Sequence, residues 1–353
     1  MMEIMKINTA LNNAGFGGAP GAYVLVDGQF GSTGKGLAAS LLASLFHNKF
    51  NVVSTNAGPN SGHTSYYGDE KIVLRQLPTF SVIASKYGRS VHTQINAGAI
   101  IDIKVLEAEQ EQYSSGGFDL WVHPLAAVAD DATKGDEAEM VSRIGSTGKG
   151  TGAALANKIM RAEKATIGQR AGYDLLIGRV NILPSDKVFI EVSQGFSLGL
   201  NQRFYPYCTS RECTVGAAMS DAGIHPEFFR QAMMVVRTFP IRVAGNSGPC
   251  YEDQREITWG DLGQEPEYTT VTNKVRRVFT WSRQQYKEAL TANRPDYIFL
   301  NFCNYLRPDE LEGFVLNNII RDYWSVMNRA PKAVLLGFGP KIEDVKLYEA
   351  GPW

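Results

Sequence analysis

The chain has 353 residues, of which 44% are hydrophobic, and its 35 basic and 36 acidic side chains give a formal net charge of −1. This length is enough for one large α/β domain or two ordinary ones, and the near-zero charge excludes a global attraction to nucleic acid or anionic membranes. The four cysteines form no CxxC pair or zinc-type cluster, and no signal-peptide or membrane-spanning pattern occurs, so we expect reduced thiols in a soluble, cytoplasmic protein.

Apolar runs that end at turn residues organise the chain. Residues 1–22 predict a polar, glycine-bearing lead-in, and residues 23–353 predict a single domain, because no Pro/Ser linker or change of composition divides them. "AYVLVDG" predicts a buried strand that enters a loop, and "LAASLLASLF" predicts a helix. Further strands are expected in "FNVVST", "LWVHPLAAVA", "VFIEVSQG" and "AVLLGFGP". The alternation of strands and helices indicates an α/β fold with a large, mostly parallel central sheet flanked by helices.

The hexapeptide GSTGKG occurs twice, at residues 31–36 and 145–150. The first copy lies between the predicted strand and helix, where backbone amides, a helix N-terminus and Lys35 can surround phosphate. It departs from the Walker A pattern, because five residues separate Gly28 from Gly34 and because Gly36 stands where Ser or Thr would bind magnesium. A glycine-rich turn without a ligand is the alternative. The flanks of the two copies differ, so we interpret them as separate phosphate loops rather than as a duplicated unit.

Two further polar, glycine-containing loops are also candidate functional sites. Residues 56–64 ("NAGPNSGHT") carry His63, the one histidine placed among such residues, although a lone histidine is more often structural than catalytic. Residues 144–152 ("IGSTGKGTG") put two hydroxyls beside glycine amides, which suits a monophosphate.

A cationic stretch lies at residues 269–279 ("TTVTNKVRRVF"). Arginine binds carboxylate or phosphate with a two-pronged fork, so cations beside threonines favour an anionic substrate. A solvated basic face is the alternative. The residues concerned are Thr272, Lys274, Arg276 and Arg277.

Taken together and in this order, these loops resemble the adenylosuccinate synthetase family. The family's GxQWGDEGKGK, GGxNAGHT and IGTTGRGIGP correspond to residues 28–36, 57–64 and 144–153, and its EGAQG and YPYVTSS correspond to residues 191–195 and 205–211. The resemblance extends from about residue 23 to about residue 340. It implies the fold of that family, with a nucleotide site like that of P-loop NTPases.

The resemblance also implies a reaction. The family transfers the γ-phosphate of a nucleoside triphosphate to the 6-oxygen of a purine monophosphate, and the amine of L-aspartate then displaces phosphate in the presence of Mg²⁺. It implies that Lys35 stabilises the migrating phosphoryl group, that His63 is the general acid, and that the Gly62 carbonyl binds magnesium. It further implies a homodimer in which Arg161 acts across the interface.

One departure from the family concerns the purine that is aminated. Ser32 and Thr33 replace an aspartate and a glutamate, and that aspartate is the family's proton acceptor at purine N1 and a magnesium ligand. A serine leaves space beside N1, where guanine carries its 2-amino group. Bacteriophages that replace adenine in their DNA with 2,6-diaminopurine carry family members that act on dGMP and lack this aspartate, and the chain resembles that branch.

A second departure concerns the phosphoryl donor. The family reads GTP with a TKxD segment, which corresponds here to residues 301–304, so Asn304 replaces the aspartate. An amide offers a donor and an acceptor, as adenine requires, so we expect ATP or dATP. Lys274 replaces an arginine, which removes a forked contact. The alternatives are neutral changes in an ordinary enzyme that uses IMP and GTP, and an inactive nucleotide-binding regulator. The group that deprotonates N1 and the choice between ATP and dATP stay open.

The expected site residues fall into four groups. The catalytic residues are His63, Lys35 and Ser32, with Gly62 (through its backbone) and Ser32 as the magnesium ligands. The nucleotide and phosphate group is Gly31, Ser32, Thr33, Gly34, Lys35, Gly36, Gly62, His63, Thr64, Arg276, Asn301, Asn304, Gly337, Gly339 and Pro340. The dGMP group is Ser32, Asn60, Ser146, Thr147, Arg161, Gln194, Cys208 and Thr209. The aspartate group is Thr270, Val271, Thr272, Lys274 and Arg276.

Overall fold

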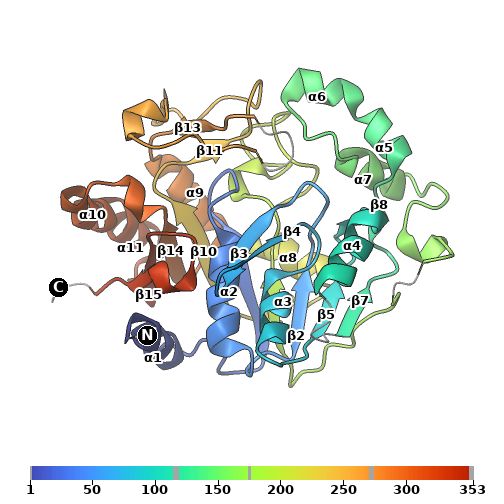
Figure 1. Ribbon diagram of the computed structural model, residues 1–353, viewed down its shortest axis with the longest axis horizontal. Helices are drawn as coiled ribbons and strands as arrows, with labels where there is room; N and C mark the ends of the chain where they lie inside the picture. The colour runs from blue at the N-terminus through green and yellow to red at the C-terminus, as the bar shows by residue number, and fades with distance from the viewer. Residues whose placement is uncertain (1, 114–118, 174–175, 270–273, 350–353) are drawn as a thin grey trace.

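A large sheet forms the centre of the molecule (Figure 1). The computed structural model describes residues 2–113, 119–173, 176–269 and 274–349. Among these residues, nine strands pair in the order β16-β15-β14-β10-β1-β9-β2-β5-β7, and every pairing is parallel except that of β15 with β16. The predicted mostly parallel sheet is therefore confirmed. Its strands are β1 (Gly21–Asp27), β2 (Val52–Thr55), β5 (His92–Ile95), β7 (Asp119–Val122), β9 (Lys187–Glu191), β10 (Phe229–Arg237), β14 (Tyr297–Asn301), β15 (Ala333–Gly337) and β16 (Val345–Leu347).

Both faces of this sheet are covered by apolar side chains. Along the central strand β1, Tyr23 and Leu25 belong to one buried cluster, whereas Val24 and Val26 belong to another. Successive side chains of a strand point to opposite faces, so a continuous apolar run requires packing on both sides. The helices are α2 (Lys35–Phe46), α3 (Thr79–Lys86), α4 (Ile103–Tyr113), α8 (Val215–Asp221), α9 (Arg283–Asn293), α10 (Pro308–Phe314) and α11 (Arg321–Met327), with a π-helical turn η7 (Val315–Ile320) between the last two.

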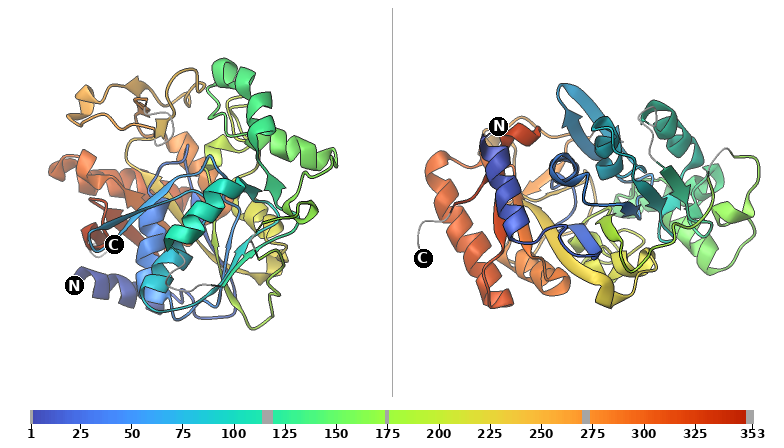
Figure 2. Two further views of the ribbon diagram at one scale, coloured as in Figure 1. Left: turned by 45° about the vertical axis from the view of Figure 1, so that its right-hand side comes forward. Right: turned by 90° about the horizontal axis from the view of Figure 1, so that it is seen from below.

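The N-terminal lead-in contains a helix, which the sequence did not predict. Helix α1 (Met2–Asn13) buries Ile7 and Leu11, which lie four residues apart and therefore on one face. Both side chains join the cluster that covers one face of the sheet. Figures 1 and 2 show α1 beside the C-terminal strands β15 and β16, so its partner comes from the opposite end of the chain.

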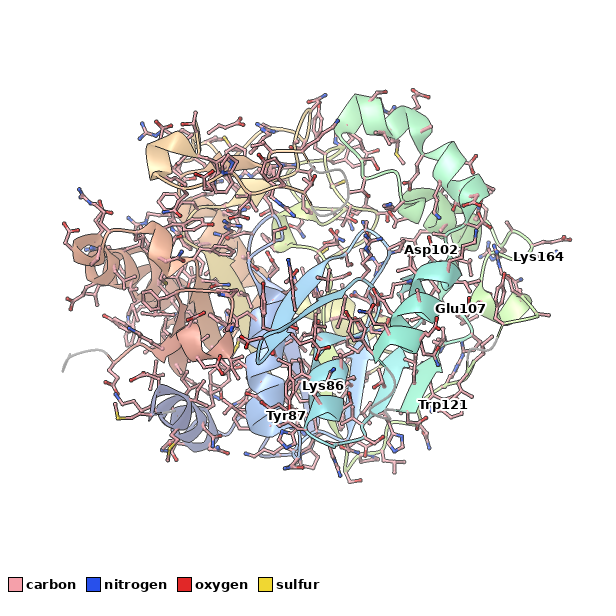
Figure 3. The ribbon with its side chains drawn as sticks, in the orientation of Figure 1. Lys86, Tyr87, Asp102, Glu107, Trp121 and Lys164 are labelled. Carbon is pink, nitrogen blue, oxygen red and sulfur yellow. The ribbon has the colours of Figure 1, made fainter. Side chains whose placement is uncertain are left out.

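Smaller elements surround the end of the sheet at which the loops gather. Three short helices form an arm on one side: α5 (Asp131–Asp136), α6 (Ala138–Ile144) and α7 (Thr151–Ile159). A salt bridge of 2.8 Å between Lys134 Nζ and Asp102, which Figure 3 labels beside α4, fastens this arm to the sheet domain. The small sheet β11-β13-β12 (Ile241–Arg242, Arg277–Phe279, Glu256–Ile257), the hairpin β3-β4 (His63–Tyr67, Glu70–Leu74) and the pair β6-β8 (Ile100–Ile101, Ala127–Val128) complete the named strands.

No helix among the described residues is both long and apolar enough to cross a membrane.

Candidate active site

A cavity of about 950 Å³ opens where the parallel strands end. Asp27 ends β1, Glu191 ends β9, and Arg237 and Asn301 end β10 and β14, which are neighbours in the sheet. The carboxyl ends of parallel strands lie at one edge, and ligands of open α/β sheets bind outside that edge. The sheet therefore brings together loops that are far apart in the sequence.

The Asp27 carboxylate organises the first phosphate loop. Its Oδ1 accepts hydrogen bonds from the amides of Gln29 (2.8 Å) and Gly31 (3.2 Å), and its Oδ2 accepts one from the Thr33 hydroxyl (2.5 Å). Lys35 Nζ lies 3.0 Å from the same Oδ2. One buried carboxylate thus sets the curvature of the loop and holds the lysine that the sequence assigned to the phosphoryl group.

Close packing explains why the loop departs from Walker A. A Cβ at Gly36 would lie 2.9 Å from the carbonyl carbon of Thr64 and nearer still to its oxygen, because α2 begins directly against β3. A serine or threonine at this position would overlap that backbone. Lys35 makes its second hydrogen bond to the Gln194 carbonyl at 2.7 Å, so the loop also touches the segment that follows β9.

His63 forms a short hydrogen bond with a buried carboxylate. Its Nδ1 lies 2.6 Å from Glu191 Oε1, and Glu191 is fully buried. Burial acts to raise the pKa of Glu191, but the hydrogen bond and charge of His63, with the amide of Phe80 at 3.2 Å, outweigh it and lower that pKa. An ionised Glu191 binds Nδ1–H, which leaves Nε2 as the ring nitrogen for chemistry. His63 lines the cavity, as a general acid requires.

Ser32 is held between two guanidinium groups. Its backbone is left-handed (φ 54°), its Oγ accepts from Arg276 Nη1 at 2.8 Å, and its carbonyl accepts from Arg237 Nη1 at 3.0 Å. A hydroxyl oxygen that already faces a guanidinium is an unfavourable ligand for a second cation, which argues against Ser32 as a magnesium ligand. The same geometry places positive charge beside the position of the missing aspartate.

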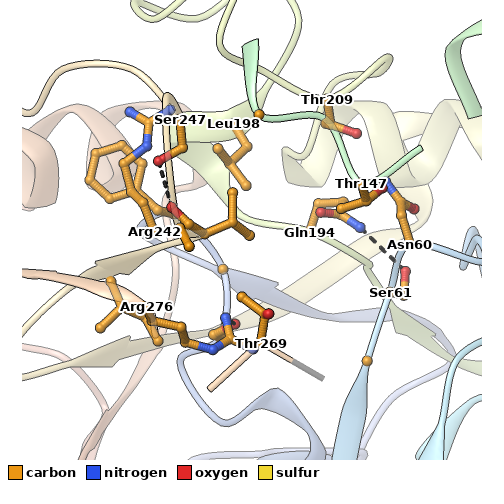
Figure 4. Close-up of a pocket in the computed structure, with 18 of the residues that line it drawn as sticks. Asn60, Ser61, Thr147, Gln194, Leu198, Thr209, Arg242, Ser247, Thr269 and Arg276 are labelled. Carbon is orange, nitrogen blue, oxygen red and sulfur yellow. Dashed lines mark hydrogen bonds between the residues drawn. The ribbon is translucent and has the colours of Figure 1, made fainter. Parts of the chain in front are cut away.

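The predicted monophosphate residues lie together on one side of the cavity. Figure 4 shows Asn60, Thr147, Gln194 and Thr209 near one another, although they come from four separate segments. Gln194 Nε2 donates to Ser61 Oγ at 3.5 Å. Both GSTGKG copies reach this cavity, because residues 31–36 and 145–147 line it.

The opposite side carries the segment that follows β14. Both polar atoms of the Asn301 side chain are hydrogen-bonded within the protein: Nδ2 donates to the Thr33 carbonyl (3.2 Å), and Oδ1 accepts from the Phe302 amide (2.9 Å). Asn304 is exposed and lines the cavity with Pro340. Gly337 does not line this cavity, and a Cβ there would overlap Asn301, so its contact with nucleotide stays a prediction.

Most of the predicted site residues therefore share one cavity. Arg161 is exposed at the end of α7, outside the cavity of its own chain, and Thr270, Val271 and Thr272 lie outside the described residues. The lining residues that were predicted are Gly31, Ser32, Thr33, Gly34, Lys35, Gly36, Asn60, Gly62, His63, Thr64, Ser146, Thr147, Gln194, Cys208, Thr209, Lys274, Arg276, Asn301, Asn304, Gly339 and Pro340.

Sequence reasoning missed the charged residues that support these groups. Asp27, Glu191, Arg237 and Glu267 do not line the cavity, but each bonds a residue that does. Three of them end or directly follow apolar strand runs, and a charge at the end of a buried strand is the signal that could have identified them.

The described residues include no group of three or more His, Cys, Asp or Glu side chains that could hold a metal ion. The Asp27 carboxylate is occupied by the loop amides, Thr33 and Lys35. Mg²⁺ prefers six oxygen ligands and commonly takes most of them from water and substrate phosphates. Gly62, whose carbonyl is the predicted magnesium ligand, lines the cavity, so the residues present fit a magnesium ion that takes its other ligands from nucleotide and water.

Similarity to known proteins extends over most of the chain. A model of the adenylosuccinate synthetase family matches residues 24–171 and 177–312. The N6-succino-2-amino-2'-deoxyadenylate synthase of Vibrio phage phiVC8 is 38% identical over 342 residues, which cover 92% of this chain and 98% of that protein. The protein of the same name from Cyanophage S-2L is 34% identical over 341 residues and 91% of each chain.

Solved structures extend the likeness to three dimensions. The Cyanophage S-2L succinoaminodeoxyadenylate synthetase, bound to dGMP and to dATP as an energy donor, superposes with a TM-score of 0.82 at 32% identity and covers 93% of this chain and 95% of that one. The adenylosuccinate synthetase of Plasmodium falciparum shares the fold, with a TM-score of 0.72 at 18% identity, over 93% of this chain and 99% of that one.

Proposed function

This chain belongs to the adenylosuccinate synthetase family, and we propose that it joins the amine of L-aspartate to C6 of dGMP with hydrolysis of ATP or dATP. The products are N6-succino-2-amino-2'-deoxyadenylate, the nucleoside diphosphate and phosphate. The enzyme is thus a C–N bond-forming ligase that supplies a precursor of the 2,6-diaminopurine deoxynucleotide, and in a phage-infected host it would act in the host cytoplasm.

Ser32 is the observation that carries this proposal. It lines the cavity with a short hydroxyl where the family has a carboxylate, and Arg276 rather than a base lies against it. Guanine differs from hypoxanthine by the 2-amino group next to N1, so the shorter side chain makes room where the larger base needs it. Two phage relatives with 38% and 34% identity carry the name of this activity.

ATP or dATP as donor follows from the other side of the cavity. The exposed Asn304 amide can donate to N1 and accept from N6 of adenine, whereas it lacks the second acceptor that guanine N1–H and N2–H₂ would need. The related Cyanophage S-2L enzyme was solved with dATP as its energy donor.

Each of the residues that line or support the site has its own role in the proposed reaction. The 6-oxygen of dGMP attacks the γ-phosphorus and expels the diphosphate, and the aspartate amine then adds at C6 and expels the phosphate. Lys35, at the centre of the phosphate loop, stabilises the charge on the migrating phosphoryl group. His63 donates from Nε2 to the 6-oxygen while Glu191 stabilises the positive ring. Arg276, bonded to Ser32 Oγ, places positive charge beside the position of the family's missing aspartate.

Magnesium would neutralise charge on the β- and γ-phosphates when it is bound, with the Gly62 carbonyl as its protein ligand. Asn60, Ser146, Thr147, Gln194, Cys208 and Thr209 would hold dGMP, and Lys274 with Arg276 would hold the carboxylates of aspartate. We place Arg161 in the dGMP site of a partner subunit, because it is exposed and lies outside the cavity of its own chain.

The test is phosphate release by the purified protein with aspartate and Mg²⁺, in which dGMP or IMP is crossed with ATP or GTP. We expect turnover with dGMP and ATP, little turnover with IMP and GTP, and none when aspartate is omitted. Ser32→Asp should reduce kcat/KM for dGMP because the carboxylate crowds the 2-amino group, and Ser32→Ala is the matched control that adds no bulk. Turnover that prefers IMP and GTP would make this an ordinary adenylosuccinate synthetase, and release without aspartate would indicate a nucleotide-hydrolysing regulator.

A further inference from the structure

We propose that Phe302 is the surface on which the purine base of the phosphoryl donor stacks, and that Arg237 is the positioning residue that supports it from behind. The proposal rests on the proposed function only in taking a purine nucleotide as the donor. It adds to the edge recognition by Asn304 a separate recognition of the face of the base.

The backbone of Phe302 is the first observation. Its φ of 59° is left-handed, a conformation that is costly for a bulky aromatic residue and that persists where the surroundings impose it. Two side chains impose it here, because Asn301 Oδ1 accepts from the Phe302 amide at 2.9 Å and Thr238 Oγ1 donates to its carbonyl at 2.8 Å. Both backbone polar groups of Phe302 are therefore bonded within the protein.

The two faces of the ring are the second observation. Arg237 Cζ lies 3.7 Å from the ring centroid, and Arg237 is fully buried and does not line the cavity. Phe302 itself does line it. The guanidinium therefore covers one face of the ring, and Tyr305 packs against the ring with the two centroids 5.3 Å apart. The rest of the half-buried side chain borders the cavity, where we place the base.

Charge pairing fixes the guanidinium in this position. Glu267 forms a two-pronged pair with Arg237, with Nη1 3.2 Å from Oε2 and Nη2 bonded to Oε1. Tyr305 donates to the same carboxylate at 3.0 Å. The remaining bond of Arg237 runs to the Ser32 carbonyl at 3.0 Å, so one buried side chain supports both the aromatic surface and the phosphate loop.

Stacking and edge recognition predict different selectivity. Every base has a π face, so stacking on an aromatic ring strengthens binding of adenine and guanine alike. Asn304 lies two residues after Phe302, on the turn η6 (Cys303–Tyr305) that Phe302 precedes, and it lines the same cavity. Loss of the Phe302 ring should therefore weaken the binding of ADP and GDP alike and keep the preference between them. A change at Asn304 should instead alter that preference.

The experiment is calorimetric binding of ADP, GDP and inorganic tripolyphosphate to the full-length protein with Mg²⁺, without dGMP or aspartate. Phe302→Leu should raise the Kd for ADP and GDP by about ten- to a hundredfold and leave tripolyphosphate unchanged. Phe302→Tyr should restore ADP binding to within about threefold, since it keeps the ring. Asn304→Asp should shift the preference towards GDP. Arg237→Lys, which keeps the charge but loses the planar fork, should weaken ADP binding less than Phe302→Leu does.

Phe338→Leu is the matched control, because Lys346 Nζ lies 5.0 Å from that ring and yet Phe338 does not line the cavity. Unchanged ADP binding in Phe302→Leu would overturn the proposal, as would equal losses for ADP and tripolyphosphate, which indicate general damage to the loop. Failure of dGMP turnover in the wild type, with the Phe302 results as expected, would refute the proposed function but not the stacking surface.

Discussion

Replacing Glu191 by glutamine removes the charge behind His63 and keeps the shape of the side chain. The amide oxygen can still accept from Nδ1, so the ring should keep its tautomer while it loses the stabilisation of its positive form. His63 Nδ1 lies 2.6 Å from Glu191 Oε1 and Glu191 is fully buried, so solvent screens the interaction between the two side chains little. A hydrogen bond to a charged group contributes about 1.5–3 kcal/mol, which corresponds to a loss of roughly ten- to 150-fold in kcat.

The assay is phosphate release at saturating ATP, aspartate and Mg²⁺ over a range of dGMP concentrations. Because His63 acts on charge that develops at the 6-oxygen, the loss should appear in kcat, with KM for dGMP nearly unchanged.

Glu109→Gln is the control. Glu109 is another buried glutamate, on α4, which accepts from the amides of Arg75, Gln76 and Leu77 (2.6, 3.1 and 2.9 Å), and it does not line the cavity. An unchanged kcat in Glu191→Gln, or an equal loss in Glu109→Gln at matched thermal stability, would refute the role of Glu191.

Three further predictions concern the phosphate loop and its supports. Lys35→Ala should abolish turnover and also cost about 3–5 kcal/mol of stability in chemical denaturation, because it leaves Asp27 buried and unpaired; the double variant with Asp27→Asn should regain stability but not turnover. Gly36→Ala should destabilise the fold by about 1–3 kcal/mol in the same assay, whereas Gly313→Ala, where a Cβ meets no atom within 4 Å and the backbone is not left-handed, should cost less. Burial acts to raise the pKa of Glu267, but the charge of Arg237 outweighs it and lowers that pKa below its ordinary 4.5. The pair of Glu267 with Arg237 therefore stabilises the fold above pH 4.5, and this contribution is lost as the pH falls below it. The difference in melting temperature between wild type and Glu267→Gln should therefore shrink from pH 7 to pH 3, and a constant difference would contradict the pairing.

The sequence by itself determined the elements whose causes are local. An alanine- and leucine-rich run after a glycine loop predicted α2, and apolar runs bounded by turn residues predicted β1, β9 and β15. Glycines marked the phosphate loops because they supply left-handed backbone, as at Gly34 (φ 94°) and Gly148 (φ 62°). Patterns of this kind need only a few neighbouring residues, and together they were specific enough to indicate the family.

The tertiary structure alone decided which groups meet. Helix α1 escaped prediction because the partners of Ile7 and Leu11 lie near the other end of the chain. The pair of His63 with Glu191 spans 128 residues, and that of Arg276 with Ser32 spans 244. The strand order β14-β10-β1-β9 sets the ends of four strands side by side, and His63 and Arg276 reach them from the β3-β4 hairpin and from the residue before β13. Strand order depends on the packing of the whole sheet, so the local sequence could supply the reacting groups but not the buried charges that position them.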